Sequence, residues 1–209
     1  MLDRKRRTKQ LTSRYSIHVF YFNLGIMKSL LLFITIIIAH PNLVTAQKYF
    51  TKNGTISFFS KTPLENISAD NNQVVSVLDT QTGEFNFSLL IQNFHFKKAL
   101  MEEHFNENYM ESDKLPKATF KGNITEPAKV DFTRDGNYNI TVTGDLTIHG
   151  ITRKISTPGT IIVKGGIVSA NSKFMVKPGD YNISIPSLVR DNIAETIEVS
   201  VSCSYQNKM

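Results

Sequence analysis

The sequence is short of the residues that would support disulfide, redox or thiolate metal chemistry. Cys203 is the only cysteine among 209 residues. One cysteine excludes an intramolecular disulfide and a thiolate metal cluster. Apolar residues stand at every second position around it, at Val199, Val201 and Tyr205. We therefore expect a buried core thiol rather than a reactive one.

The body of the chain also lacks an excess of charge. Residues 1–46 hold seven of the 24 Lys and Arg residues and one of the 18 Asp and Glu residues, which leaves 17 of each sign in the remainder. The formal net charge of +6 therefore belongs to the N-terminal part of the chain. A basic body would have suggested nucleic acid or an anionic membrane as partner, and its balanced charge argues against both.

Residues 1–46 have the layout of a secretory signal peptide. Lys28 precedes an apolar run over 30–39, and small residues at Val44 and Ala46 stand at the −3 and −1 positions of a cleavage site. The run is shorter than the roughly twenty residues that span a bilayer. We expect cleavage after Ala46 and a periplasmic or secreted protein of residues 47–209. An uncleaved anchor, helped by the basic cluster at 4–7, is the alternative, and translation starting at Met27 is left open.

Alternation with a period of two dominates residues 47–209, with no internal repeat or interdomain linker. In 139–149, for example, Ile140, Val142, Leu146 and Ile148 alternate with polar residues. Such a pattern indicates strands with one dry and one wet face. We expect strands over 54–61, 72–78, 84–91, 118–126, 139–149, 155–163, 167–176 and 197–205, separated by turn signals at 82–83, 135–137, 164–166 and 178–180. The fold class is all-β, an eight-stranded antiparallel barrel.

One segment, residues 97–110, departs from this alternation. Leu100, Met101, Phe105 and Met110 stand near helical spacing, and the segment has no β-branched residue. We expect one or two short helices here, ending before Ser112. The insert could cover one mouth of the barrel or could be a packed plug.

Four stretches of the sequence, taken together, resemble the YceI-like family of lipid-binding proteins. They are residues 58–69, residues 104–120 (His104 to Phe120), residues 144–153 (Gly-Asp-Leu-Thr-Ile-His-Gly-Ile-Thr-Arg), and the 174–199 region containing Phe174-Met175-Val176 and Asp180-Tyr181-Asn182-Ile183. The chain departs from the family pattern after Phe174, where Lys177-Pro178-Gly179 intervenes.

The resemblance implies a lipocalin-like barrel over residues 47–209 that holds a polyisoprenoid chain in its bore, the interior channel of the barrel. It also implies no catalytic activity, no metal and no cofactor beyond the bound isoprenoid-type lipid. Many relatives are exported.

The expected ligand-binding residues are apolar side chains on strands or on the insert. They are Phe58, Phe85, Phe87, Phe94, Leu100, Phe105, Met110, Phe120, Ile124, Val142, Leu146, Ile148 and Phe174. Gly122 and Gly144 occupy inward positions, where a missing side chain either leaves room for a ligand or lets a strand bend.

Polar candidates for a catalytic or metal site are weak in this sequence. Glu102, Glu103 and His104 are adjacent, so on a helix they point in different directions, and His95 could join them only through the tertiary fold. His149, before Gly150, is expected at a turn and has no evident nucleophile beside it. We expect no enzyme and no metal site.

The sequence therefore predicts an exported protein that holds an apolar lipid, such as an isoprenoid quinone or polyprenyl chain, for transport, storage or sequestration. We expect only transient membrane contact and no nucleic acid partner, and a homodimer is left open. The alternative is a non-catalytic interaction module of the cell envelope whose barrel is fully packed by its own side chains.

Overall fold

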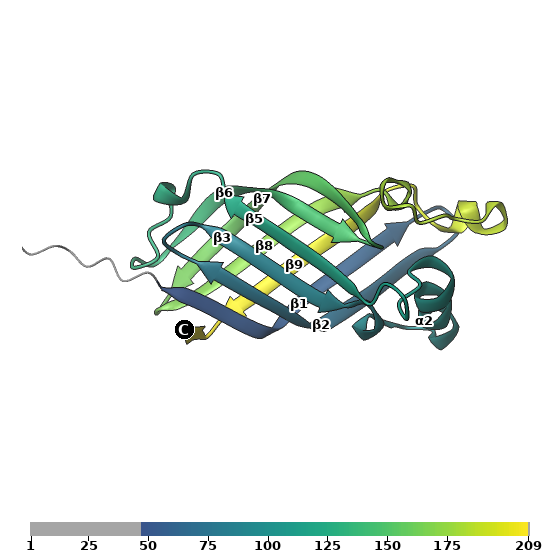
Figure 1. Ribbon diagram of the computed structural model, residues 1–209, viewed down its shortest axis with the longest axis horizontal. Helices are drawn as coiled ribbons and strands as arrows, with labels where there is room; N and C mark the ends of the chain where they lie inside the picture. The colour runs from purple at the N-terminus through teal and green to yellow at the C-terminus, as the bar shows by residue number, and fades with distance from the viewer. Residues whose placement is uncertain (1–46, 209) are drawn as a thin grey trace, which may run out of the picture. The chain divides into compact units, whose positions relative to one another are not determined.

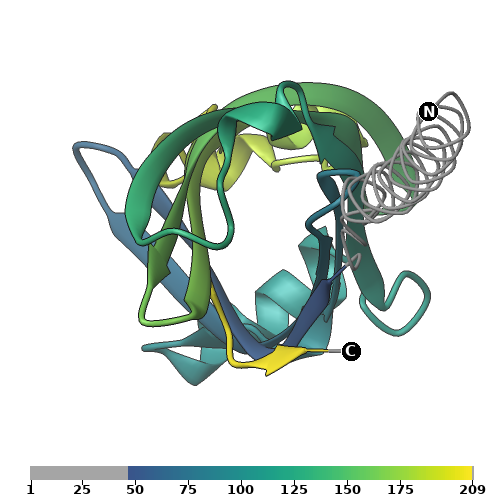
Figure 2. The same cartoon turned by 90° about the vertical axis from the view of Figure 1, so that its left-hand side faces the viewer.

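Eight long antiparallel strands form a closed barrel in the computed structural model, which describes residues 47–208. The strands are β1 (Lys48–Lys61), β2 (Asn66–Asp79), β3 (Glu84–Leu90), β5 (Lys117–Ile124), β6 (Gly136–Ile148), β7 (Ile151–Lys164), β8 (Ile167–Val176) and β9 (Ile197–Tyr205). Neighbours along the chain pair with each other, and β1 closes the ring by pairing with β9. The view along the barrel in Figure 2 shows this ring.

The predicted all-β barrel with eight strands is confirmed, and several strands are longer than the sequence indicated. β1 begins at Lys48 instead of residue 54, and β2 begins at Asn66 instead of residue 72. Two further two-residue strands extend the sheet, β4 (His95–Phe96) beside β2 and β10 (Asn207–Lys208) beside β1. The expected turn at 135–137 lies earlier, because Gly136 and Asn137 already belong to β6.

Tight turns connect the strands where the sequence supplies residues that accept positive φ. His149 and Gly150 join β6 to β7 with φ of 49° and 72°, as a two-residue type I′ turn requires. Gly165 and Gly166 join β7 to β8, also with positive φ at both positions. The expected position of His149 in a turn is therefore confirmed.

The helical insert lies between β3 and β5 at one end of the barrel (Figure 1). It contains a 3-10 turn at Ile91–Asn93, the helix α2 at Ala99–His104 and a π-helical turn at Phe105–Tyr109. The expectation of short helices over 97–110 is confirmed. Pro116 then returns the chain to extended backbone, and β5 begins at the next residue, Lys117.

A second irregular segment, residues 177–196, connects β8 to β9 at the same end of the barrel (Figure 1). It contains 3-10 turns at Pro178–Tyr181 and Ser187–Asn192. Within residues 47–208, none of the helices has the length and apolar character needed to cross a membrane. The predicted signal peptide lies outside the described residues.

The barrel interior contains two apolar clusters, one toward each end. The first fills the end away from the insert and includes Leu78, Phe85, Ile161 and Val168, each at most 2% exposed. The second lies beneath the insert and includes Ile91, Phe94 and Met110. The two ends of the barrel are therefore packed by different parts of the chain.

Cys203 belongs to the first cluster, as the sequence led us to expect. A side chain at Gly54 on β1 would place its Cβ 2.5 Å from the Cys203 sulfur, so the glycine makes room for the thiol. The register of β1 with β2 shifts on both sides of Gly54, which marks an irregular point in the strand. Burial raises the pKa of the Cys203 thiol to about 12.

Candidate functional site

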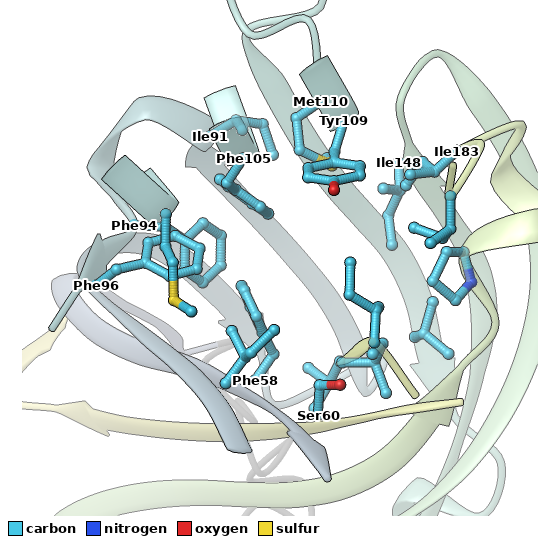
Figure 3. A pocket seen from close by; sticks show the side chains of 18 of the residues that line it. Phe58, Ser60, Ile91, Phe94, Phe96, Phe105, Tyr109, Met110, Ile148 and Ile183 are labelled. Carbon is cyan, nitrogen blue, oxygen red and sulfur yellow. The ribbon is translucent and has the colours of Figure 1, made fainter. Parts of the chain in front are cut away.

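A cavity of about 380 Å³ occupies the end of the barrel beneath the helical insert. Its lining is almost wholly aliphatic and aromatic, and Figure 3 shows side chains converging on it from several elements. The lining residues are Ile56, Phe58, Ser60, Glu65, Ile67, Leu89, Ile91, Phe94, Phe96, Met101, His104, Phe105, Tyr109, Met110, Ala118, Leu146, Ile148, Phe174, Val176, Pro178, Ile183, Ile185, Val189, Asn192, Ile193, Ile197 and Val199. Ligand sites for small apolar molecules have this size and character.

The strands contribute to the wall through their period of two. On β1 the lining residues are Ile56, Phe58 and Ser60, and on β9 they are Ile197 and Val199. Successive side chains of a strand point to opposite faces, so every second residue faces the interior. The alternation that predicts the strands therefore also supplies the cavity wall.

Aromatic rings from the insert close one side of the cavity. The ring centroid of Phe105 lies 5.5 Å from that of Phe58, 5.7 Å from that of Phe94 and 5.1 Å from that of Phe96. These tilted and edge-on arrangements are favourable for aromatic pairs. Because Phe58 lies on β1, the cluster attaches the insert to the barrel wall (Figure 3).

The connection from β8 to β9 closes the other side of the cavity. Ile183, Ile185, Val189 and Ile193 from this segment all line the cavity. These four residues were not among the expected ligand-binding residues, although most of the segment belongs to the 174–199 region that resembles the family. The alternation of Ile183 with Ile185 and the four-residue spacing of Val189 and Ile193 were the signals that could have revealed them.

A few polar groups stand in or beside the apolar wall. Lys98 donates to Glu65 at 2.9 Å and Asn192 donates to the same carboxylate at 3.3 Å, and together they hold the pKa of Glu65 below its usual value. The Ser60 hydroxyl accepts a hydrogen bond from the backbone N–H of Ala194. The phenol of Tyr109 points into the cavity (Figure 3). The polar lining thus offers hydrogen bonds and one carboxylate, and no Lys or Arg side chain.

The cavity ends where the strands pass from lining residues to packed core. Leu89 on β3 and Ala118 on β5 line it, whereas the next inward residues, Phe87 and Phe120, pack against the first cluster. Their ring centroids lie 6.2 Å apart in an edge-to-face arrangement. We call Phe87 and Phe120 the floor of the cavity. The bore is therefore a cavity with a closed floor, not a channel through the barrel.

Gly122 and Gly144 do not leave room for a ligand. They are paired across β5 and β6, and a Cβ on either would lie 2.5 Å or 2.7 Å from the ring of Phe120. The space above the two glycines is therefore filled by this ring, which belongs to the floor. The structure instead gives these glycines a role that the sequence did not suggest, close approach of the β5 and β6 backbones to each other and to the Phe120 ring.

Seven of the thirteen residues expected to bind ligand line the cavity: Phe58, Phe94, Phe105, Met110, Leu146, Ile148 and Phe174. Five others lie on the floor or below it, in the packed end: Phe85, Phe87, Phe120, Ile124 and Val142. Leu100 is exposed, and its neighbour Met101 faces the cavity instead. Alternation gives the direction of a side chain but not its height in the barrel, so the sequence could not separate these five residues from the cavity lining.

His149 connects three segments near the cavity. Its Nδ1 atom lies 3.1 Å from the backbone oxygen of Tyr181, and its Nε2 atom lies 3.3 Å from Oε2 of Glu111. Glu111 lies in the insert, just after its π-helical turn, and Tyr181 belongs to the β8–β9 connection. The side chain is therefore used to join the turn at 149–150 to the two segments that cover the cavity.

The other polar candidates form a smaller arrangement on the insert. His95 lies 3.5 Å from Glu102, whose second oxygen accepts the backbone N–H of Phe96 at 3.0 Å. Within the described part of the chain, no three His, Cys, Asp or Glu side chains are grouped as a metal site would need. Glu102 thus serves to fold the start of α2 against β4.

Comparison with solved structures places the fold among known barrels. A polyisoprenoid-binding domain from Saccharophagus degradans, implicated in plant cell wall breakdown, matches with a TM-score of 0.66 and 15% identity, covering 77% of this chain and 97% of that one. BcnA of Burkholderia cenocepacia matches with a TM-score of 0.61 and 15% identity, covering 73% and 96%. A YceI protein of Campylobacter jejuni matches with a TM-score of 0.51 and 18% identity, covering 76% and 86%.

Identities this low show a shared fold, and sequence comparison adds the family. Curated protein sequences give no match to this chain. The sequence profile of the YceI-like domain matches residues 38–205, which is most of the chain. The protein therefore belongs to the YceI-like family.

Proposed function

We propose that this protein is an exported, non-catalytic lipid-binding protein that holds a polyisoprenoid or similar apolar chain in its cavity, for transport, storage or sequestration. The observation that carries the proposal is the cavity of about 380 Å³ with its hydrocarbon wall. Each buried methylene contributes about 0.8 kcal/mol, so roughly ten chain carbons would supply micromolar affinity. The polyisoprenoid-binding domain of Saccharophagus degradans, which shares the fold, supports the same ligand class.

The placement of the polar groups suggests how such a ligand would lie. The apolar chain would run toward the floor, and a head group would lie near Tyr109, Ser60 and the Glu65–Lys98 pair. An isoprenoid quinone has carbonyl oxygens that would accept a hydrogen bond donated by the Tyr109 phenol. Export rests on the predicted signal peptide of residues 1–46 and its cleavage after Ala46.

An interaction module of the cell envelope is the second candidate, and one observation favours it. The end of the barrel away from the insert is filled by its own side chains, with Phe85, Ile161 and Val168 buried there. If the cavity end were also occupied in solution by rearranged side chains, no ligand would enter. The protein would then act through its surface.

Native mass spectrometry of residues 47–209, purified from a bacterial periplasm without detergent, separates the two candidates. We expect an additional mass that denaturation releases and that corresponds to an isoprenoid lipid. Ala118→Phe, which places a ring in the cavity wall, should reduce the bound lipid. The matched change Ala128→Phe, at an exposed position of the β5–β6 connection that does not line the cavity, should leave it unchanged. A lipid-free protein that stays so after incubation with isoprenoid quinones and phospholipids would favour the interaction module.

A further inference from the structure

Three leucines that are each more than 60% exposed stand beside the cavity on three separate segments of the chain. Leu64, Leu100 and Leu188 are 68%, 61% and 95% exposed. The residue after each one lines the cavity: Glu65, Met101 and Val189. An isolated exposed leucine is ordinary on a protein surface, but three such leucines beside one apolar cavity form a pattern.

The three segments lie at the same end of the barrel. Leu64 belongs to the turn between β1 and β2, Leu100 to α2, and Leu188 to the β8–β9 connection. Figure 1 shows these segments together at the end that carries α2. We call Leu64, Leu100 and Leu188 the leucine rim.

We propose that the leucine rim inserts into the surface of a lipid bilayer and holds the cavity opening against it. The inference rests on the proposed function, because an apolar chain must leave a membrane before it can enter the cavity. With the rim in the bilayer, the chain would pass from hydrocarbon to the apolar lining with little exposure to water. Apolar residues on a surface that meets lipid insert at the boundary between head groups and acyl chains.

The charges near the rim indicate what kind of bilayer it fits. Four basic residues lie within three positions of a rim leucine, Lys61, Lys97, Lys98 and Arg190, and so do four acidic ones, Glu65, Glu102, Glu103 and Asp191. Lys98 and Glu65 are paired with each other at 2.9 Å. A balanced rim gains no attraction to anionic lipid, so we expect binding to neutral bilayers that is little affected by salt.

Vesicle flotation of residues 47–209 with phosphatidylcholine vesicles, at low and at high salt, tests the proposal. Burying a leucine contributes about tenfold or more to a partition coefficient, so Leu188→Ser should lower it about tenfold. The triple variant Leu64→Ser/Leu100→Ser/Leu188→Ser should lower it at least about a hundredfold. Ile167→Ser is the matched control, because Ile167 is an exposed aliphatic residue at the β7–β8 turn, away from the lining.

The outcomes divide clearly. Flotation that depends on the leucines, persists in high salt and is kept by Ile167→Ser supports the rim. Equal flotation of the wild type and the triple variant overturns the proposal, as does a wild-type protein that fails to float. A wild-type dimer that the triple variant converts to a monomer, without any vesicle binding, would assign the leucines to contact between copies and also overturn it.

A separate readout keeps this test apart from the proposed function. Lipid delivered from detergent should load the wild type and the triple variant to the same final extent, since the rim leucines do not line the cavity. Loading from vesicles should be slower in the triple variant. If neither protein takes up lipid from detergent, the proposed function fails, whereas equal loading rates from vesicles would reject the rim alone.

Discussion

Nε2 of His149 lies 3.3 Å from Oε2 of Glu111, and both residues hold a positive φ, 49° and 44°. Positive φ is uncommon outside glycine, so the surrounding structure keeps both backbones in place. The imidazole reaches Tyr181 on its other side, so this one side chain joins the two segments that cover the cavity.

We predict that His149→Asn loosens this cover without disturbing the turn. Asparagine accepts positive φ and is favoured in type I′ turns, but its side chain is too short to reach Glu111 and Tyr181 together. The lost hydrogen bond should cost about 1 kcal/mol of unfolding free energy. Hydrogen exchange should quicken in residues 105–115 and 178–183. Lys164→Asn, at an exposed position at the far end of β7, serves as control, and unchanged exchange in both segments would contradict the linkage.

The floor leads to a prediction about chain length. Phe120→Ala should open the cavity toward the packed end, so that the longest isoprenoid chain bound in a competition series increases. The substitution should cost about 3–5 kcal/mol of stability, and Phe120→Leu offers a milder variant. Phe132→Ala, at a partly buried ring of the first cluster, is the control. An identical length preference in the wild type and both Phe120 variants would show that Phe120 does not limit the ligand.

Tyr109 should report on the head group. Tyr109→Phe keeps the ring but removes the hydroxyl that points into the cavity (Figure 3). For a ligand with a carbonyl or hydroxyl head we expect about fivefold weaker binding, which corresponds to about 1 kcal/mol, and no change for a hydrocarbon of equal length. Isothermal titration measures both. Tyr138→Phe is the control, since the Tyr138 hydroxyl donates to the backbone oxygen of Arg134 instead. Equal losses for both ligands would argue against a head group at Tyr109.

The contact between Gly54 and Cys203 predicts a compensating pair of substitutions. Gly54→Ala should destabilise the protein by about 1–3 kcal/mol, because its Cβ would lie 2.5 Å from the Cys203 sulfur. Cys203→Ala in the Gly54→Ala background should recover part of that loss in urea unfolding. Gly179→Ala, where no atom lies within 4 Å of the new Cβ, should have little effect. Additive effects of the two core substitutions would rule out the steric coupling.

The same thiol should be inert in the native protein. Because burial raises the pKa of Cys203 to about 12, almost no thiolate forms at pH 8. We expect a maleimide reagent to label Cys203 only after denaturation. Fast labelling of the folded protein would mean that the packed end of the barrel opens readily.

The strands could be predicted from the sequence because a half-buried strand alternates apolar and polar residues along its length. In 139–149 the alternation of Ile140 and Val142 with polar neighbours predicts β6 almost to its ends. The residues of β1 before Gly54 were not predicted as a strand, because Gly54 interrupts the alternation at an irregular point in the register. Such a break appears in sequence as the end of a strand.

The cavity was harder to predict than the barrel. Val142 and Leu146 have the same pattern and face the same interior, yet only Leu146 lines the cavity. Their difference in height depends on strand stagger and on the ring of Phe120, which are properties of the whole barrel. For Leu100 and Met101, helical spacing at the start of a six-residue helix could not decide which side chain faces the cavity.

The closure of the ring between β1 and β9 makes the fold depend on its two most distant segments. The hydroxyls of Ser76 on β2 and Tyr205 on β9 lie 2.7 Å apart in the buried interior, although 129 residues separate them in sequence. Until β9 pairs with them, β1 and β8 each have one unpaired edge. The part of the cavity wall that Ile197 and Val199 form is then also missing. Contacts of such long range make folding slow and leave open edges that invite aggregation. A chain truncated before residue 197 should therefore aggregate through these open strand edges and should not fold into a smaller barrel.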